Sequence, residues 1–321
     1  GRARPSLGTM LIGIDVGGSK ASALLVDPTT WAIVGRERTT SHGNGPALVE
    51  SLATMVGGLR KHSPEPVSAV GLGIAGLAGR SGTVAWSPNL PGAVGHPVGP
   101  DLERAVGLPV AVGNDATTAT LAEARLGAGR DCDDFALVTL GTGIGGGFVL
   151  GGRLHTGANG FSGEPGHMVV SADGPVHLTG LRGPWEYYAS GNALGRLGRE
   201  AASTGTFPRG IQLAGSAGGI TGHHVMDAVA EGDQPAQAVF TDWCTEVARG
   251  VANLVVLLDL SRIVLGGGLA DVGEPLRAGV AAALGGLLPG ADSRPLVDVV
   301  LAQLGADAGA LGAALLASDP A

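Results

Sequence analysis

Two glycine-rich turns lie 124 residues apart in this chain, and their residue types suit the binding of phosphate. The first turn consists of Gly17, Gly18, Ser19 and Lys20, and the second of Gly141, Thr142 and Gly143. One such turn carries little information, because glycine allows any tight connection between strands. Exposed backbone N–H groups at such turns form concave anion sites, however, so two facing turns can hold a polyphosphate from both sides. The pair predicts an ATP-dependent phosphotransferase.

Carboxylates stand at two of the expected strand ends. Asp15 comes just before the first turn, where it can hold Mg²⁺ directly or through water; alternatively, it only stabilises the turn. Asn114 and Asp115 lie between a strand expected at 109–112 and the following helix, where the chain must leave the sheet at the cleft. There Asp115 can take a hydroxyl proton as general base while Asn114 orients the substrate. The alternative for Asp115 is a helix N-cap.

Two further segments combine glycine with residues that recognise ligands. Glu164 and His167 lie in a loop constrained by Gly163, Pro165 and Gly166, and fixed carboxylate and imidazole groups suit a polyol. A solvated surface loop is the alternative. The other segment consists of three glycines that follow an apolar strand: Gly266, Gly267 and Gly268. They can let an adenine ring lie close to the backbone; alternatively, they only form a tight turn. The other histidines are expected on the surface or in the core; they are His42, His62, His96, His155, His223 and His224.

Composition narrows the class of protein. The chain has 321 residues, with 44% hydrophobic and 15% charged side chains, which predicts two globular domains. The net charge of −8, without a basic run, argues against a nucleic-acid surface. No apolar stretch reaches about 18 residues, so no membrane span is expected. Two cysteines, Cys132 and Cys244, fit a reducing cytoplasm. Met10 is expected to be the natural start, with residues 1–9 an extension.

The elements needed to position these residues alternate between strand and helix. Strands are expected at 11–16, 21–26, 31–38, 69–74, 83–86, 109–112, 135–140, 146–150, 153–156, 262–265 and 296–302. Helices are expected at 46–61, 101–106, 117–126, 236–259 and 307–317, with others between 184 and 236 and after 268. Each half then reads β-β-β-α-β-α-β-α, which predicts α/β layers with a cleft between the halves.

Five motifs occur together and in order: Asp15 to Lys20, Ser87-Pro88-Asn89-Leu90-Pro91-Gly92, Gly113-Asn114-Asp115, Leu140 to Gly147, and Gly163 to His167. In this the chain resembles the ROK family of sugar kinases, from Met10 onward. The resemblance implies a two-domain actin/hexokinase-like (ribonuclease H-like) fold. The small domain would comprise residues 10–118 and 303–321, and the large domain 119–302.

The resemblance also implies residue roles. ATP with Mg²⁺ would be the donor and a hexose hydroxyl, usually on C6, the acceptor, with glucose as the leading substrate. Asp115 would be the base, and the sugar contacts would be Asn89, Asn114, Asp115, Glu164, His167 and Glu186. Asp15 would serve Mg²⁺, the two glycine turns would hold phosphate, and Gly266 to Gly268 would lie by the adenosine. A homodimer or higher homo-oligomer is expected. Sugar binding is expected to close the two halves over the cleft about a hinge near residues 113–120 and 300–305.

Two positions depart from the family pattern. Ala93 replaces the usual aromatic residue after the Pro-Gly of the Asn89 loop, which can reshape the sugar pocket. The family's zinc-binding histidine and three cysteines map onto His167, His177, Thr179 and Pro184, so no zinc is expected. The loop from His167 to Glu186 is then expected to be held by proline and apolar packing, through Pro175, Val176, Leu178, Leu181, Pro184 and Trp185. A modified site completed by Asp173 or Cys244 is the alternative.

Three other functions would use parts of the same pattern. A DNA-binding repressor of the same family is not expected, because the first strand is reached by residue 11. A catalytically silent sugar sensor is disfavoured by the presence of Asp15, Asp115 and both turns. Inorganic polyphosphate in place of ATP, or another hexose or N-acetylhexosamine in place of glucose, would use the same residues.

Overall fold

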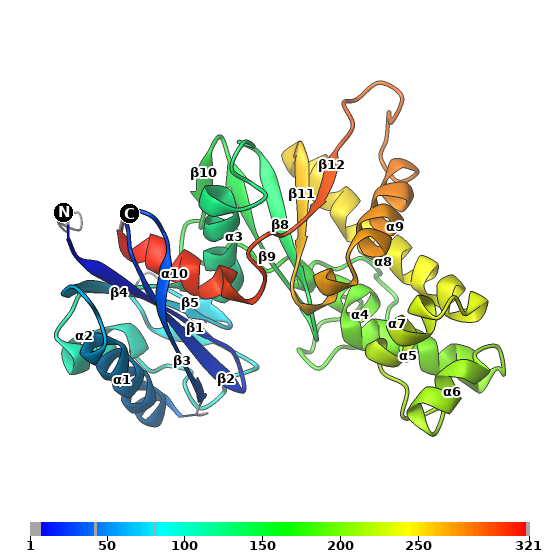
Figure 1. Cartoon of the computed structure of the whole chain (residues 1–321). Coiled ribbons are helices and arrows are strands. Elements are labelled where there is room, and N and C mark those ends of the chain that lie inside the picture. The colour runs from blue at the N-terminus through cyan, green and yellow to red at the C-terminus, as the bar shows by residue number, and fades with distance from the viewer. Residues whose placement is uncertain (1–7, 42–43, 80, 319–321) are drawn as a thin grey trace. The chain divides into compact units, whose positions relative to one another are not determined.

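The computed structural model describes residues 8–41, 44–79 and 81–318, and within them the chain divides into two compact units (Figure 1). The first contains the residues up to Asp133, Gly147–Gly163, and the residues from Gln303 onward; the second contains Asp134–Gly146 and Glu164–Ala302. The expected boundary after residue 118 differs from this division, which keeps the helix at that position whole. The expectations for His42 and for residues 1–7 lie outside the described residues.

The first sheet has five strands in the order β3-β2-β1-β4-β7. Its strands are β1 (Met10–Val16), β2 (Lys20–Val26), β3 (Ile33–Thr40), β4 (Val67–Ile74) and β7 (Val110–Asn114). The helices of the same unit are α1 (Gly45–Lys61), α2 (Val98–Val106), α3 (Asp115–Leu126) and α10 (Ala308–Ser318), the last preceded by a 3-10 turn, η3 (Gly305–Asp307). A small hairpin pairs β5 (Leu77–Ala78) with β6 (Val84–Trp86).

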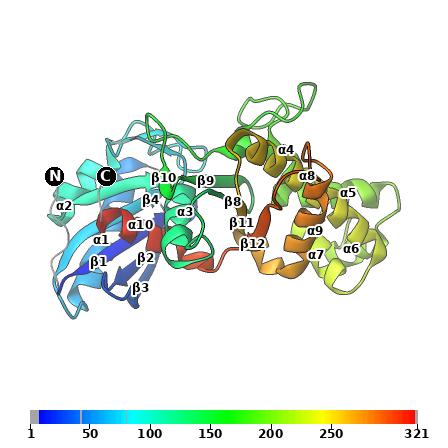
Figure 2. The same cartoon turned by 90° about the horizontal axis from the view of Figure 1, so that it is seen from above.

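Alternation along β1 and β4 sends large and small residues to opposite faces of the first sheet. Ile12, Ile14, Leu72 and Ile74 join one hydrophobic core with the buried residues of α1 and α2. On the other face the strands carry glycine, and α10 approaches so closely that a Cβ on Gly13 or Gly71 would collide with its backbone. α10 itself consists mostly of alanine, glycine and leucine, so it can lie buried between the sheet and α3. Figure 2 shows α10 beside α3.

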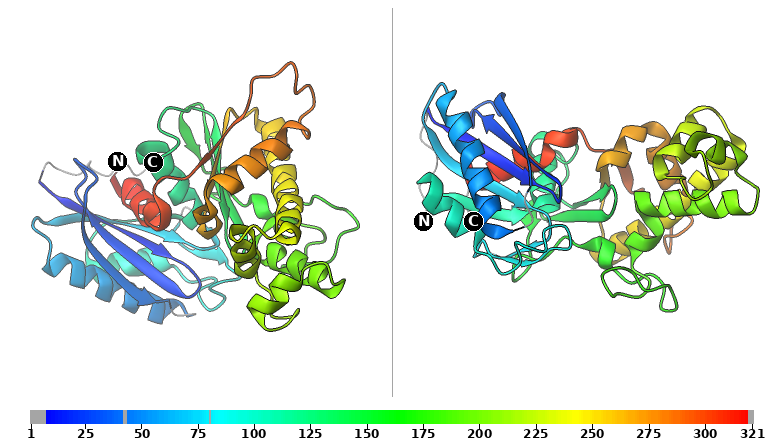
Figure 3. Two further views of the ribbon diagram at one scale, coloured as in Figure 1. Left: turned by 45° about the vertical axis from the view of Figure 1, so that its right-hand side comes forward. Right: turned by 90° about the horizontal axis from the view of Figure 1, so that it is seen from below.

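The second sheet also has five strands, in the order β10-β9-β8-β11-β12. They are β8 (Phe135–Leu140), β9 (Ile144–Leu150), β10 (Arg153–His155), β11 (Arg262–Gly266) and β12 (Asp298–Leu301). β10 and residues 147–150 of β9 belong to the first unit, whereas β8, the start of β9, β11 and β12 belong to the second. The helices of the second unit are α4 (Trp185–Ala189), α5 (Gly191–Ser203), α6 (Pro208–Ala214), α7 (Gly222–Ala230), α8 (Gln234–Leu258) and α9 (Glu274–Gly285). Two 3-10 turns are η1 (Pro165–His167) and η2 (Gly268–Val272). α8 runs beside α9, as the yellow and orange helices of Figure 3 show.

The predicted α/β class is confirmed, and the two sheets repeat one strand order. In both, the last two strands are parallel to their neighbours, because helices connect them. The third strand begins at Ile33, two residues later than expected, because Asp27–Ala32 form a closed turn first. The sequence analysis did not identify β5, which is only two residues long.

Candidate functional site

The first glycine turn joins β1 to β2 and faces solvent. The N–H of Gly17 donates to the carbonyl of Lys20 over 3.0 Å, which closes the turn. Gly18, Ser19 and Lys20 are exposed. A Cβ on Gly18 would lie 3.0 Å from the Cβ of Asn89, so the structure brings the predicted phosphate turn and the predicted sugar residue Asn89 together.

Asp15 lies on the small-residue face of the first sheet, next to the start of α10. A Cβ on Gly309, in the first turn of α10, would lie 2.7 Å from the carboxyl carbon of Asp15. The carboxylate therefore packs against the N-terminal end of a helix, where the backbone dipoles favour negative charge. Glycine at position 309 makes this approach possible.

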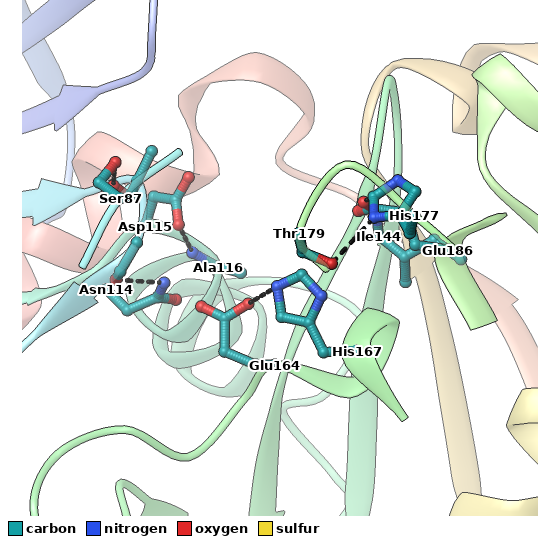
Figure 4. Close-up of polar contacts among 12 residues, drawn as sticks. Ser87, Asn114, Asp115, Ala116, Ile144, Glu164, His167, His177, Thr179 and Glu186 are labelled. Atoms are coloured by element: carbon teal, nitrogen blue, oxygen red, sulfur yellow. Dashed lines mark hydrogen bonds and ion pairs between the residues drawn. The ribbon is translucent and has the colours of Figure 1, made fainter. Parts of the chain in front are cut away.

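Asn114 and Asp115 occupy the point where β7 turns into α3 (Figure 4). Asn114, rather than Asp115, is the helix N-cap: its side-chain oxygen accepts from the N–H of Thr117 over 2.9 Å. Its amide nitrogen donates to the carbonyl of Gly76 over 3.0 Å. Asp115 is the first residue of α3, and one of its oxygens accepts from the N–H of Ala116 over 2.8 Å. The bond from Ala116 engages one carboxylate oxygen of Asp115, and the cap by Asn114 engages neither.

Asp15 and Asp115 both have perturbed pKa values. Burial raises the pKa of Asp15 to about 7; the nearby charge of Asp115 raises it further and Lys20 opposes the change. Burial also raises the pKa of Asp115, against hydrogen bonds from backbone N–H groups that lower it. In the sheet register, Asp15 pairs with Gly73, which pairs with Gly113, so both carboxylates stand at one sheet edge. Burial and the neighbouring charge of Asp115 both disfavour the charged form of Asp15, and a hard divalent cation would relieve that cost, so the Asp15 carboxylate fits Mg²⁺.

The Asn89 loop is held by Ser87, a residue to which the sequence analysis gave no role. The buried hydroxyl of Ser87 donates to the carbonyl of Ala75 over 2.7 Å and accepts from the N–H of Leu90 over 3.0 Å. Leu90 is buried and Asn89 is exposed, so the anchored loop presents the amide. Ala93 is fully buried in the core beside α1 and α2. The small residue there adapts the loop to that core.

The second glycine turn already holds an anionic group, the carboxylate of Glu186. One oxygen of Glu186 accepts from the N–H of Ile144 over 2.7 Å. A Cβ on Gly143 would collide with the same oxygen, so glycine at this position lets the carboxylate approach the backbone of the turn. Glu186 was predicted to contact sugar and Gly143 to contact phosphate; the structure brings these two residues together.

His177 also contacts the Glu186 carboxylate, a contact that the sequence analysis did not predict. Its Nε2 lies 3.5 Å from the second oxygen of Glu186, and its Nδ1 lies 3.1 Å from the hydroxyl of Thr179 (Figure 4). His177 and Thr179 were considered only as the positions of lost zinc ligands. The signal available in the sequence was the pairing of a histidine and a hydroxyl two residues apart.

The expected apolar packing of the loop from His167 to Glu186 is wrong for three of its four side chains. Val176, Leu178 and Leu181 are 58%, 81% and 39% exposed, whereas Trp185 is fully buried and its indole N–H donates to the carbonyl of Glu246 over 2.9 Å. The backbone holds this loop instead. The N–H of His177 donates to the carbonyl of Leu181 over 2.8 Å, and further bonds join 170 to 183, 183 to 175 and 185 to 168.

Glu164 precedes the short turn η1, and His167 is the last residue of that turn. His167 Nε2 lies 3.8 Å from an oxygen of Glu164, with the two side chains 23% and 24% exposed. The structure thus brings together the predicted carboxylate and imidazole of this loop, as Figure 4 shows. Both side chains keep an accessible edge.

Gly266 ends β11, Gly267 connects the strand to η2, and Gly268 begins η2. Gly267 has a φ of 79°, and a Cβ there would lie 2.7 Å from the backbone nitrogen of Leu140, the last residue of β8. A Cβ on Gly268 would meet nothing within 4 Å. Gly267 therefore serves the tight turn beside the second glycine turn, and Gly268 leaves open space next to the backbone.

The described residues contain no group of three or more His, Cys, Asp or Glu side chains arranged to hold a metal ion. Cys244 is buried in α8, and burial raises the pKa of its thiol to about 12, which disfavours the thiolate form that a zinc ion needs. Within the described part of the chain, no helix has the length and apolar character to cross a membrane.

Comparison with known proteins places this chain in a family. Residues 11–320 match the model of the ROK family. A glucokinase from Streptomyces coelicolor is 35% identical over 315 residues, which cover 97% of this chain and 98% of the relative. An N-acetylmannosamine kinase from Escherichia fergusonii is 32% identical over 308 residues, 95% of this chain and 97% of the relative.

A solved structure gives the same result. The crystal structure of a ROK family glucokinase from Streptomyces griseus, in complex with glucose and AMPPNP, is 36% identical and superposes with a TM-score of 0.85. The match covers 96% of this chain and 99% of that one. It confirms the expected actin/hexokinase-like α/β fold. Since the family model and these relatives span nearly the whole chain, the protein belongs to the ROK family.

Proposed function

We propose that this protein transfers the γ-phosphoryl group of ATP to a hexose hydroxyl, with glucose as the leading acceptor and the C6 hydroxyl as the attacking group. One observation carries the proposal: Asp115, a carboxylate whose pKa is raised by burial, stands at the same sheet edge as Asp15 and the first glycine turn. The relatives named glucokinase support glucose as the acceptor.

Asp115 acts as the general base. A carboxylate with a raised pKa holds a proton better, so it can take the hydroxyl proton as the sugar oxygen attacks the γ-phosphorus and ADP leaves. Asn89, Glu164 and His167 bind the sugar hydroxyl groups. Asn114 serves first as the cap that fixes Asp115.

The first glycine turn supplies backbone N–H groups to phosphate oxygens, and Lys20 adds positive charge beside them. Asp15 would hold Mg²⁺, which neutralises charge on the transferring phosphoryl group when bound. Gly268 would leave room for the adenosine, and Gly141 and Thr142 would contact phosphate on the other side. Glu186 would contact the sugar with the oxygen that does not accept from Ile144.

A coupled assay of ADP formation tests the proposal with glucose, mannose, N-acetylmannosamine and N-acetylglucosamine, each with ATP and with inorganic polyphosphate. We expect glucose with ATP to give the highest kcat/KM. The N-acetylmannosamine kinase relative makes that sugar the second candidate. A catalytically silent sugar sensor is the remaining alternative: sugar binding in calorimetry, together with no phosphorylation of any of the four sugars by either donor, would establish it and refute the kinase.

A further inference from the structure

Glu123 is a buried carboxylate that the proposed mechanism does not use. It lies near the C-terminal end of α3 and is 0% exposed. One oxygen accepts from the N–H of Gln303 over 3.0 Å and of Leu304 over 2.9 Å. The other accepts from the N–H of Ala128 over 2.8 Å and lies 3.2 Å from the N–H of Gln303.

Three backbone donors on two separate segments therefore surround one carboxylate. Buried charge is costly unless it is hydrogen-bonded, and here backbone N–H groups provide that compensation on both oxygens. A Cβ on Gly127 would collide with the carboxylate, so the glycine that ends α3 also makes room for it. Both oxygens of the Glu123 side chain act as acceptors, whereas a carboxamide has one acceptor oxygen and one NH₂ group that only donates.

The clamped segment leads directly into α10. Gln303 and Leu304 follow β12 and precede η3, after which α10 begins at Ala308. Gly309 in its first turn packs against Asp15, and Gly312 packs against the backbone of Thr118 in α3. Glu123 thus ties together two helices, one beginning with Asp115 and the other packing its first turn on Asp15.

We propose that Glu123 is a positioning residue for phosphoryl transfer: its clamp on Gln303 and Leu304 fixes α10 against α3 and so holds Asp15 in the position needed for Mg·ATP. This inference rests on the proposed function. Outer partners of metal-binding residues commonly change metal affinity or activity about 10- to 100-fold when altered. Glu123 acts through Asp15 and touches neither substrate.

The test compares Glu123→Gln with a matched control, Glu103→Gln. Glu103 also accepts a backbone N–H through its carboxylate, that of Val110 over 3.0 Å, but it lies in α2. Three measurements are made: hydrogen exchange of amides 303–309, the Kd for Mg·AMPPNP by calorimetry, and steady-state kinetics. For Glu123→Gln we expect faster exchange, an increase in Kd and in the KM for Mg·ATP of about 10-fold, and a glucose KM within twofold of wild type.

Unchanged Mg·AMPPNP affinity in Glu123→Gln, or an equal loss in Glu103→Gln, overturns the proposal. If Glu123→Gln does not fold, two measurements replace it. Wild-type amides 303 and 304 must exchange as slowly as those in the centre of β1, and Glu123→Asp, which keeps the charge on a shorter stem, must weaken Mg·AMPPNP binding. Failure of either one refutes the clamp. If no hexose is phosphorylated, the proposed function fails, whereas nucleotide affinity and exchange still decide the role of Glu123.

Discussion

At the residue scale, the carboxylates of Asp15 and Asp115 differ in their surroundings. Asp115 begins a helix and accepts one backbone N–H, with Asn114 providing the cap. Asp15 packs against the glycine of another helix and has its pKa raised to about 7. These differences suit Asp115 to proton transfer and Asp15 to a bound cation.

Asp115→Asn is expected to lower kcat by about 10²- to 10⁴-fold, the usual contribution of a general base. The cap by Asn114 does not involve the Asp115 side chain, so α3 and sugar affinity should stay intact. Steady-state kinetics and glucose calorimetry measure the two effects. A variant that keeps more than about a third of wild-type kcat would remove Asp115 from the mechanism, given that same range.

Asp15→Asn is expected to change how stability depends on pH in the Mg²⁺-free protein. Between pH 3.8, the ordinary pKa of an aspartate, and about pH 7, folded Asp15 keeps a proton that the unfolded chain has lost. Its contribution to the free energy of unfolding is therefore full below pH 3.8 and is lost as pH rises to about 7. Wild type loses this contribution as pH rises from 5 to 8, whereas the variant does not. The free energy of unfolding of the variant relative to wild type should therefore rise by up to about 3 kcal/mol, because pH 5 lies about two units below the raised pKa.

Urea unfolding of both proteins at the two pH values measures this difference. The same variant should lose most of its Mg²⁺-dependent activity, because the amide is a weaker cation ligand. A stability difference that does not change with pH would show that Asp15 titrates normally.

At the element scale, the glycines of helix α10 allow its close approach to Asp15 and to α3. Gly309→Ala should displace the Asp15 carboxyl group, since the new Cβ would lie 2.7 Å from its carboxyl carbon. We expect a folded variant with lower stability and a raised KM for Mg·ATP. Gly57→Ala is the matched control, because Gly57 lies inside α1 with nothing within 4 Å of the added Cβ. The control should be stabilised by about 0.5–1 kcal/mol, and equal behaviour of both variants would contradict the close approach.

The loop from His167 to Glu186 is expected to fold without zinc. Its backbone bonds and the buried Trp185 hold it, and His177 lies against Thr179 and Glu186. Elemental analysis of extensively dialysed protein should find less than about 0.1 zinc per chain, because a closed structural site needs four ligands. Stoichiometric zinc, or unfolding on addition of a chelator, would refute this prediction and support a modified site.

At the scale of the whole molecule, the chain passes between its two units after residues 133, 146, 163 and 302. Of the two hinge segments expected from the sequence, 113–120 and 300–305, the second contains such a passage and the first lies within one unit. Because phosphoryl transfer requires exclusion of water, glucose and AMPPNP together should reduce the radius of gyration in X-ray scattering.

Equal radii with and without both ligands would count against closure. Glucose alone and AMPPNP alone serve as controls, since closure should need both substrates to be complete. The molar mass from the same scattering data tests the expected homodimer or higher homo-oligomer.

The sequence by itself determined the order of strands and helices, the two glycine turns and the chemical types at the site. These features are local: apolar periodicity follows from the geometry of one strand or helix, and Asp15, Asn114 and Glu164 stand beside glycines that indicate turns. The sequence also limited the N-cap of α3 to Asn114 or Asp115, because both residue types are good N-caps. Only the backbone conformation shows that Asn114 is the cap and Asp115 the first helical residue.

Tertiary structure alone decided which distant residues meet. Nothing local links Glu123 to Gln303, Gly309 to Asp15, or Glu186 to Ile144, because each contact joins segments brought together by packing. The same reason explains the wrong expectation for Val176, Leu178 and Leu181. Apolar side chains bury only where a partner surface exists, whereas backbone hydrogen bonds within a loop stabilise it without one.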